Sequence, residues 1–159
     1  MKYSENTLAL LWLNSFDMLS PLRRSKILEL TDEPYRLYKD IEKYQSEIVA
    51  ISDDTTYERL ALARDKSYME MLIGEIDRYG IDLVGIYDGN YPCLLKEIDT
   101  PPILLYCKGN TEILDKRFIA VVGTRLPSRY GRDVTEKFTE ELIKYGFHII
   151  SGLARGIDT

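Results

Sequence analysis

The chain has 159 residues, of which 45% are hydrophobic and 30% are charged. These proportions exclude a disordered or collagen-like chain, and the length excludes two complete large domains. The formal net charge of -5 excludes a protein that is basic all over, although it leaves room for a local basic site. We expect a cytoplasmic protein without a membrane partner, because no long uncharged apolar segment and no signal-peptide pattern occur.

Composition changes near Gly80. One glycine precedes it and nine glycines are found from Gly80 onward. Such a change is expected where a helical segment gives way to strands that are joined by tight loops. The sequence therefore predicts a helical domain over residues 1–79 and an α/β domain over residues 80–159.

Helical spacing of apolar residues runs through the first part of the chain. It predicts a helix from Leu8 to Phe16, a second helix that Ser20 and Pro21 begin, and a short helix over residues 32–44. A longer helix is predicted to begin at Thr55 or Thr56. Its inward residues are expected to be Leu60, Ala63, Met71 and Leu72.

Strand patterns replace the helical period after Gly80. Strands are predicted over residues 81–86, 103–107, 118–122 and 147–150, with a helix over residues 129–145. The unbroken apolar run 118–122 indicates a strand that is covered on both faces, as in a parallel sheet. The buried face of the helix is expected to hold Val134, Phe138, Leu142 and Tyr145.

Two glycine loops follow the last two predicted strands. Strand, helix and strand over residues 118–150 form a βαβ unit, so the loops at Gly123 and Gly152 open on the same carboxyl edge of the sheet. Free backbone N–H groups and the following helix start favour an anion such as phosphate there. Neither loop has a dinucleotide or Walker fingerprint.

Basic residues gather around the first glycine loop. The stretch 108–132 contains six basic and two acidic residues, a net charge of +4 within a chain of -5. Arg125 is the most informative, because an arginine just past a buried strand can hold a phosphate through two parallel hydrogen bonds. No metal or cofactor is predicted: Cys93, Cys107 and His148 are too few and too widely spaced, and both thiols are expected to pack as small hydrophobic groups.

Four sequence blocks stand out in the second half of the chain. They are Asn90 to Pro92, Pro101 to Gly109, Ala120 to Arg125 with Ser128, Tyr130 and Gly131, and Ser151 to Asp158. Together these blocks resemble the DNA-processing protein A family, also called DprA or Smf. They occur in the family's order over residues 87–159, and the helical part before Gly80 is compatible with the family's N-terminal domain.

The resemblance implies a helical, sterile-alpha-motif-like N-terminal domain followed by a Rossmann-like parallel α/β domain. It further implies single-stranded DNA binding, delivery of that DNA to the RecA recombinase in natural transformation (competence), homodimers, and no catalytic activity. Asp158 matches an acidic residue that opens the family's next helix, where a helix cap is expected. The DNA-binding residues that it implies here are Gly123, Thr124, Arg125, Ser128, Ser151, Gly152 and Gly156.

The family continues beyond the position that matches Thr159. We therefore expect this chain to be an N-terminal fragment with an incomplete Rossmann-like domain. Most of the family's dimer surface and RecA-contacting surface are expected beyond Thr159.

Two other classes stay open. One is a Rossmann-like enzyme such as a nucleoside monophosphate phosphoribohydrolase, although His148 is expected to be a core residue and not a catalytic base. The other is a protein-interaction module in which Trp12 and Phe16 form a docking face, although a packed core explains them more simply.

Overall fold

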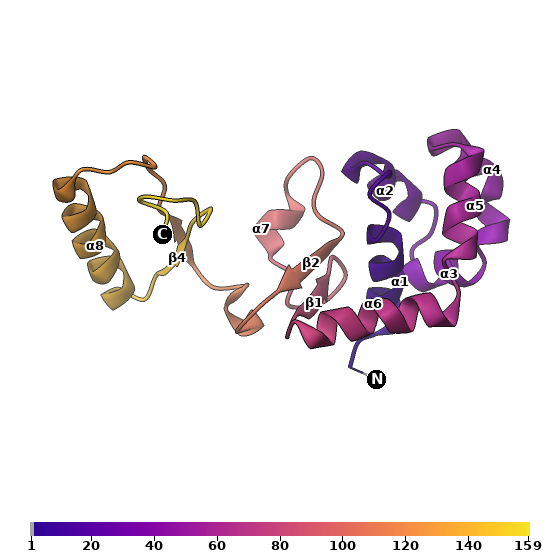
Figure 1. Cartoon of the computed structure of the whole chain (residues 1–159), viewed down its shortest axis with the longest axis horizontal. Helices are drawn as coiled ribbons and strands as arrows, with labels where there is room; N and C mark the ends of the chain where they lie inside the picture. Colours follow the sequence, from indigo (N-terminus) through magenta and orange to yellow (C-terminus); the bar gives the residue numbers. More distant parts are fainter. Residues whose placement is uncertain (1) are drawn as a thin grey trace. The chain divides into compact units, whose positions relative to one another are not determined.

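The computed structural model describes residues 2–159, which form two compact units that divide between Leu114 and Asp115 (Figure 1). The first unit holds most of the helices together with a β-hairpin. The second unit holds one long helix and two short strands. Among the residues described, no helix is long and apolar enough to cross a membrane.

Six α-helices and a short 3₁₀ helix make up most of the first unit. Ser20 accepts a hydrogen bond from the backbone N–H of Arg23 and Pro21 is the first helical residue of α2, which confirms the predicted start of that helix. The elements are α1 (Glu5–Asn14), α2 (Pro21–Leu28), α3 (Pro34–Lys39), η1 (Ile41–Tyr44), α4 (Gln45–Ile51), α5 (Asp54–Leu62) and α6 (Lys66–Arg78).

The prediction of one long helix from Thr55 or Thr56 is wrong, because α5 and α6 are separate helices. Asp53 caps α5 by accepting a hydrogen bond from the N–H of Thr56 at 2.7 Å, and Asp65 caps α6 in the same manner. A capping carboxylate satisfies N–H groups that a continuous helix would bond internally, so each cap marks a new start. Met71, predicted to point inward, is 54% exposed.

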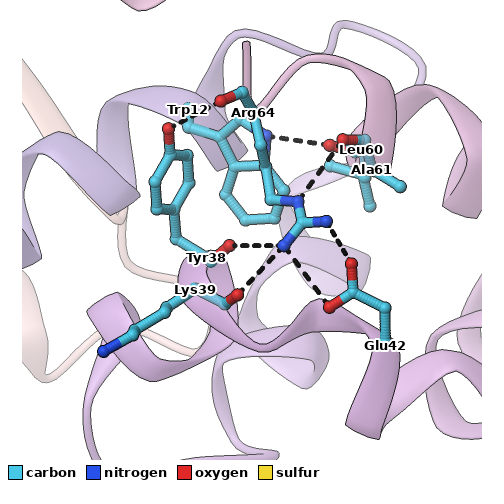
Figure 2. A network of polar contacts seen from close by, with 7 residues as sticks. All are labelled: Trp12, Tyr38, Lys39, Glu42, Leu60, Ala61 and Arg64. Carbon is cyan, nitrogen blue, oxygen red and sulfur yellow. Dashed lines mark hydrogen bonds and ion pairs between the residues drawn. The ribbon is translucent and has the colours of Figure 1, made fainter. Parts of the chain in front are cut away.

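The core of the first unit surrounds Trp12, whose side chain is fully buried. Its indole N–H donates to the carbonyl of Leu60 at 3.1 Å, and the ring of Tyr38 packs edge-on with the centroids 5.4 Å apart (Figure 2). A fully buried tryptophan offers no docking surface. The packed-core interpretation of Trp12 is therefore confirmed.

Arg64 links three segments of this unit at the break between α5 and α6. Its guanidinium group donates to the carbonyl oxygens of Tyr38, Lys39 and Ala61 and pairs with the carboxylate of Glu42 (Figure 2). Carbonyl groups at a helix end lack partners within the helix, and a guanidinium group can satisfy several of them at once. Arg64 thereby holds the end of α3 close to α5.

The hairpin of β1 (Asp82–Gly85) and β2 (Leu104–Cys107) is antiparallel and packs with the helices. Leu83 and Leu104 belong to the helical core. The short elements α7 (Cys93–Lys96) and η2 (Thr111–Ile113) complete this unit. The division of the structure at Leu114 therefore differs from the boundary predicted at Gly80, since the hairpin shares the core of the helices.

Two of the blocks that carry the family resemblance contact each other within this hairpin region. The hydroxyl of Tyr91 donates to the carbonyl of Pro102 at 2.7 Å. Asp88 accepts hydrogen bonds from the N–H of Gly85 at 2.7 Å and from the hydroxyl of Thr7 in α1. These contacts give Tyr91 and its neighbours a structural role.

The second unit is a βαβ unit formed by β3 (Phe118–Ala120), α8 (Arg129–Lys144) and β4 (His148–Ile150). The two strands are parallel and pair Ile119 with Ile149, which confirms the topology that the sequence predicts. Gly146, with φ of 81°, follows the end of α8.

The apolar faces of this unit are more exposed than predicted. Val122, just after β3, is 73% exposed, so the prediction of a strand covered on both faces is wrong there. Phe138 on α8 is 66% exposed and Tyr145, just after its end, is 80% exposed, so the prediction of a buried helix face is wrong at these positions. A sheet of two strands offers only one narrow surface to a single helix. Val134 and Leu142 are half-buried, whereas Phe138 and Tyr145 face away from any covering element among the described residues.

Candidate nucleic-acid interface

The two glycine loops of the second unit are joined to each other. The N–H of Gly123 donates to Oδ1 of Asp158 at 3.1 Å, and the N–H of Ile157 donates to the carbonyl of Thr124 at 3.2 Å. The N–H of Val121 continues the β3 ladder to the carbonyl of Ile150 at 2.9 Å. The structure thus brings both loops together at the carboxyl edge of the two strands, as the βαβ topology predicts.

Close packing of these loops requires glycine at two positions. A Cβ atom at Gly156, where φ is 112°, would collide with the backbone of Thr124 and Arg125. At Gly123 a Cβ atom would lie 2.7 Å from the side chain of Ile157. Both glycines therefore allow the loops to approach each other.

The hydroxyl groups of the predicted site bind the loops themselves. Ser151 donates to the carbonyl of Asp158 at 2.7 Å, Thr124 accepts from the N–H of Leu126 at 3.2 Å, and Ser128 caps α8 by accepting from the N–H of Gly131 at 3.1 Å. These hydrogen bonds shape the site: Ser151 uses its O–H group within the loop, whereas Thr124 and Ser128 accept and keep their own O–H groups as donors.

The N–H of Gly123 is also engaged, because the Asp158 carboxylate occupies the place that an anion would take beside it. Asp158 thus ties the two loops together, and the helix cap expected at this position stays a prediction. Gly152, in the second loop, is exposed, and a Cβ atom there would lie 3.3 Å from Oδ2 of Asp158. The backbone cradle expected from the glycine pattern is thus partly filled by the chain itself.

Guanidinium groups supply the free positive charge of the site. Arg125, Arg132 and Arg155 line one hollow of about 310 Å³, together with Leu126, Pro127 and Gly156. None of the three arginines forms an ion pair with a carboxylate of residues 2–159. The sequence singled out Arg125, but it did not indicate that Arg155 and Arg132 lie on the same hollow.

Two other members of the predicted basic stretch are engaged elsewhere. Lys116 pairs with Asp115 at 3.4 Å, and the guanidinium of Arg117 lies over the ring of Phe147, 5.2 Å from its centroid. The positive charge near the loops is therefore more focused than the count over residues 108–132 indicates.

Residues with other chemistry lie away from the hollow or are not grouped. His148 lies on β4 with its ring edge-on to Phe118, the centroids 5.8 Å apart. Both cysteines are free thiols, but Cys93 is exposed and not packed as expected. Within the described part of the chain, no group of three histidine, cysteine or acidic side chains is arranged to hold a metal ion.

A parallel strand–helix–strand unit with two joined glycine loops is part of a Rossmann-like domain, and here it carries free guanidinium groups at its sheet edge. The family model of DNA recombination-mediator protein A matches residues 82–159. The chain belongs to this family, that of DNA-processing protein A or Smf.

The relatives agree with this placement. The DNA processing protein DprA of Bacillus subtilis is 45% identical over 80 residues, which are 50% of this chain and 27% of that protein. Protein Smf of Borreliella burgdorferi is 31% identical over 145 residues, covering 91% of this chain and 40% of the relative. The chain thus spans less than half the length of these relatives.

The fold agrees with a solved structure as well. The X-ray structure of DNA processing protein A from Streptococcus pneumoniae matches with a TM-score of 0.69 and 29% identity, covering 99% of this chain and 52% of that one. The likeness confirms the predicted fold class, a helical N-terminal part followed by part of a Rossmann-like domain.

Proposed function

We propose that this chain binds single-stranded DNA at the joined loops and takes part in DNA processing during natural transformation. The observation that carries the proposal is the free guanidinium of Arg125 at the junction of both loops. A guanidinium group binds phosphate oxygens through paired, charge-assisted hydrogen bonds. The chain is acidic overall, so this local site and not a diffuse field would attract the DNA.

Exposed apolar side chains beside the loops favour single strands over duplex. Leu126, Tyr130 and Leu153 are each between 77% and 79% exposed. Unpaired bases can stack on an aromatic ring or lie on apolar side chains, whereas bases of a duplex are already stacked. Leu153 also has a φ of 51°, a conformation that non-glycine residues adopt at a cost.

Fluorescence anisotropy with labelled oligonucleotides tests the site. Replacement of Arg125 by alanine should weaken binding of single-stranded DNA by roughly 1.5–3 kcal/mol, the usual range for hydrogen bonds to charged groups. Arg125→Lys should restore only part of this loss, because an ammonium group keeps the charge without the planar fork.

Lys137→Ala is the matched control. Lys137 is exposed, forms no ion pair among the described residues, and lies about 140° around α8 from Arg132. The Lys137→Ala substitution therefore removes one positive charge at a position that faces away from the loops. Equal weakening by Arg125→Ala and Lys137→Ala would show that binding is diffuse and that the proposed site is wrong.

Comparison of single-stranded and duplex oligonucleotides tests the substrate class. We expect tighter binding of the single strand at equal length, with a log–log salt slope of about -0.7 per neutralised phosphate. Equal affinity for both forms would contradict the proposal.

Delivery of DNA to the RecA recombinase and pairing into homodimers are part of the same proposal. The exposed apolar residues of the second unit, among them Phe138 and Tyr145, support a further protein contact. Strand exchange by RecA on DNA coated with single-strand-binding protein, measured with and without this chain, tests the first. Light scattering at several concentrations tests the second.

The proposal assigns the site a binding role without catalysis. His148 packs against Phe118 on β4, and the carboxylate of Asp158 is hydrogen-bonded to Gly123, so neither is placed as a free acid or base in the arginine-lined hollow. Release of free base from nucleoside monophosphates by the purified chain would instead establish the enzyme class.

A further inference from the structure

Three arginines from three separate segments converge on the hollow beside the joined loops. Arg125 follows β3, Arg132 lies in the first turns of α8, and Arg155 lies in the loop after β4. We call this feature the arginine hollow. It is lined by Arg125, Leu126, Pro127, Arg132, Arg155 and Gly156.

The arginine hollow has an uncompensated charge. Its lining contains three cations and no carboxylate, and no ion pair neutralises these guanidinium groups among residues 2–159. The adjacent carboxylate of Asp158 lines a neighbouring hollow and accepts from Gly123. One phosphodiester carries a single negative charge, so it would leave two of the three cations without a partner.

The walls of the arginine hollow are fixed by the backbone. Gly156 fits against Thr124 and Arg125 only because it has no side chain, and the Pro127 ring restricts its own φ. The N–H of Ile157 bonds to Thr124 at 3.2 Å, which ties the segment that carries Arg155 to the segment that carries Arg125. The backbone segments that carry these two arginines are thus held together before any ligand binds.

We propose that the arginine hollow binds phosphate groups that together carry about two negative charges. Arg125 binds one of these charges, and Arg132 and Arg155 bind the other. This rests on the proposed binding of single-stranded DNA. Two sources have this chemistry: two successive phosphodiesters of one strand, or a terminal phosphate, which carries about -1.5 to -2 at neutral pH.

The first test uses Arg132→Ala and Arg155→Ala in the full chain, with Lys137→Ala as the control. Each arginine variant should bind single-stranded DNA roughly ten-fold more weakly, since a charge-assisted hydrogen bond is lost. Each should also reduce the magnitude of the log–log salt slope by about 0.7, because one phosphate contact disappears. Lys137→Ala should change neither quantity.

Folding of the variants is followed by far-ultraviolet circular dichroism, and Arg155→Gln provides a second variant that keeps the length and polarity of the side chain. Arg155→Lys should restore the salt slope and only part of the affinity. A folded Arg155→Gln that binds as the unchanged chain does would contradict the proposal.

The second test separates the two sources of phosphate. Oligonucleotides of one sequence carry a 5′-hydroxyl, a 5′-phosphate or a 3′-phosphate. Equal affinities assign the hollow to successive phosphodiesters. Tighter binding of an oligonucleotide with a phosphorylated end, together with loss of this difference in affinity in Arg155→Ala, assigns the hollow to a terminal phosphate.

The outcomes also distinguish this proposal from the proposed function. Arg125→Ala could weaken binding while Arg132→Ala and Arg155→Ala keep the affinity and salt slope of the unchanged chain. In that case the proposed role of the arginine hollow is wrong, and the proposed DNA site at Arg125 remains. If the unchanged chain binds no single-stranded DNA, the proposed function fails and this proposal fails with it.

Discussion

At the residue scale, the polar groups of the two loops divide into groups that bind the chain and groups that are free. Ser128, Ser151 and Asp158 each form a hydrogen bond within the second unit. The guanidinium groups of Arg125 and Arg155 have no ion-pair partner among the described residues. Loss of a free group should affect binding without affecting stability, whereas loss of an engaged group should lower the stability of the second unit.

Gly156→Ala tests whether close loop packing requires glycine. The alanine Cβ would collide with the Thr124 backbone at a φ of 112°, so we expect a loss of roughly 1–3 kcal/mol in the stability of the second unit. Thermal unfolding followed by far-ultraviolet circular dichroism measures this loss.

Gly146→Ala is the control for that change. Gly146 also has a positive φ, of 81°, and lies in the same unit, but nothing lies within 4 Å of the place of its Cβ. It therefore separates strain in the backbone dihedral from the collision between loops. Equal destabilisation by both variants would show that the loops do not pack as described.

At the scale of single elements, the sequence predicts the period of each segment better than its boundaries. The βαβ order, Ser20 and Pro21 at the start of α2, and the glycine loops follow from local patterns. The sequence pattern does not predict the break between α5 and α6, because Ala63 and Arg64 fit a helical pattern and only the cap at Asp65 marks the start of a new helix.

The candidate site was only partly predictable for a related reason. Arg125 is adjacent to its strand, so local sequence indicates its position. Arg155, which follows Arg125 by 30 residues, joins it only through tertiary packing between the two loops, which a pattern of spacing does not contain. Arg132 is near Arg125 in the sequence, but only the placement of α8 brings it to the same hollow. The sequence contains only a weak signal for Arg155: it lies within a block of the family resemblance, next to Gly156, which packs against Thr124 and Arg125.

The two capping aspartates predict that the stability of the first unit falls at acidic pH; we call this fall the acid limb. A backbone N–H of Thr56 lowers the pKa of Asp53, and the hydroxyl and backbone N–H of Ser67 lower the pKa of Asp65. Because the folded-state pKa is the lower one, this stability is present above the unfolded-state pKa of about 3.9 and is lost as pH falls through the folded-state pKa.

Asp53→Asn with Asp65→Asn should flatten that acid limb. Asparagine keeps a capping oxygen but does not titrate, so the melting temperature should depend less on pH below about 4. Some dependence should remain, since the pKa values of Asp40 and Glu42 are lowered as well. Melting curves at several pH values, followed by the fluorescence of Trp12, measure the change. An acid limb as steep as in the unchanged chain would contradict the assignment of these caps.

At the scale of the whole molecule, the hydrophobic core lies on one side of the division at Leu114. All of the buried hydrophobic side chains, including Trp12, Leu60 and Leu104, lie in residues 2–114 among the residues described. The second unit instead has half-buried strands and several large exposed apolar side chains. Since burial of apolar surface is the main favourable term in folding, the second unit should be the less stable of the two.

The position of the single tryptophan makes this difference measurable. Trp12 is fully buried in the first unit, so its fluorescence reports the unfolding of that unit alone. Far-ultraviolet circular dichroism reports the helices of both units, including α8. On heating, we expect the circular dichroism signal to begin to fall before the fluorescence changes, because transitions that differ between probes indicate separate unfolding.

Hydrogen exchange should place the early transition within the chain. Amides of β3, α8 and β4 are expected to exchange faster than amides of α1, whose residues pack around Trp12. Gly156→Ala should move the early transition to lower temperature and leave the Trp12 transition where it is, because its collision lies wholly within the second unit. Coincident transitions by both probes, with uniform protection up to Thr159, would show that the second unit gains a covering partner, such as a second copy of the chain, that buries Phe138 and Tyr145.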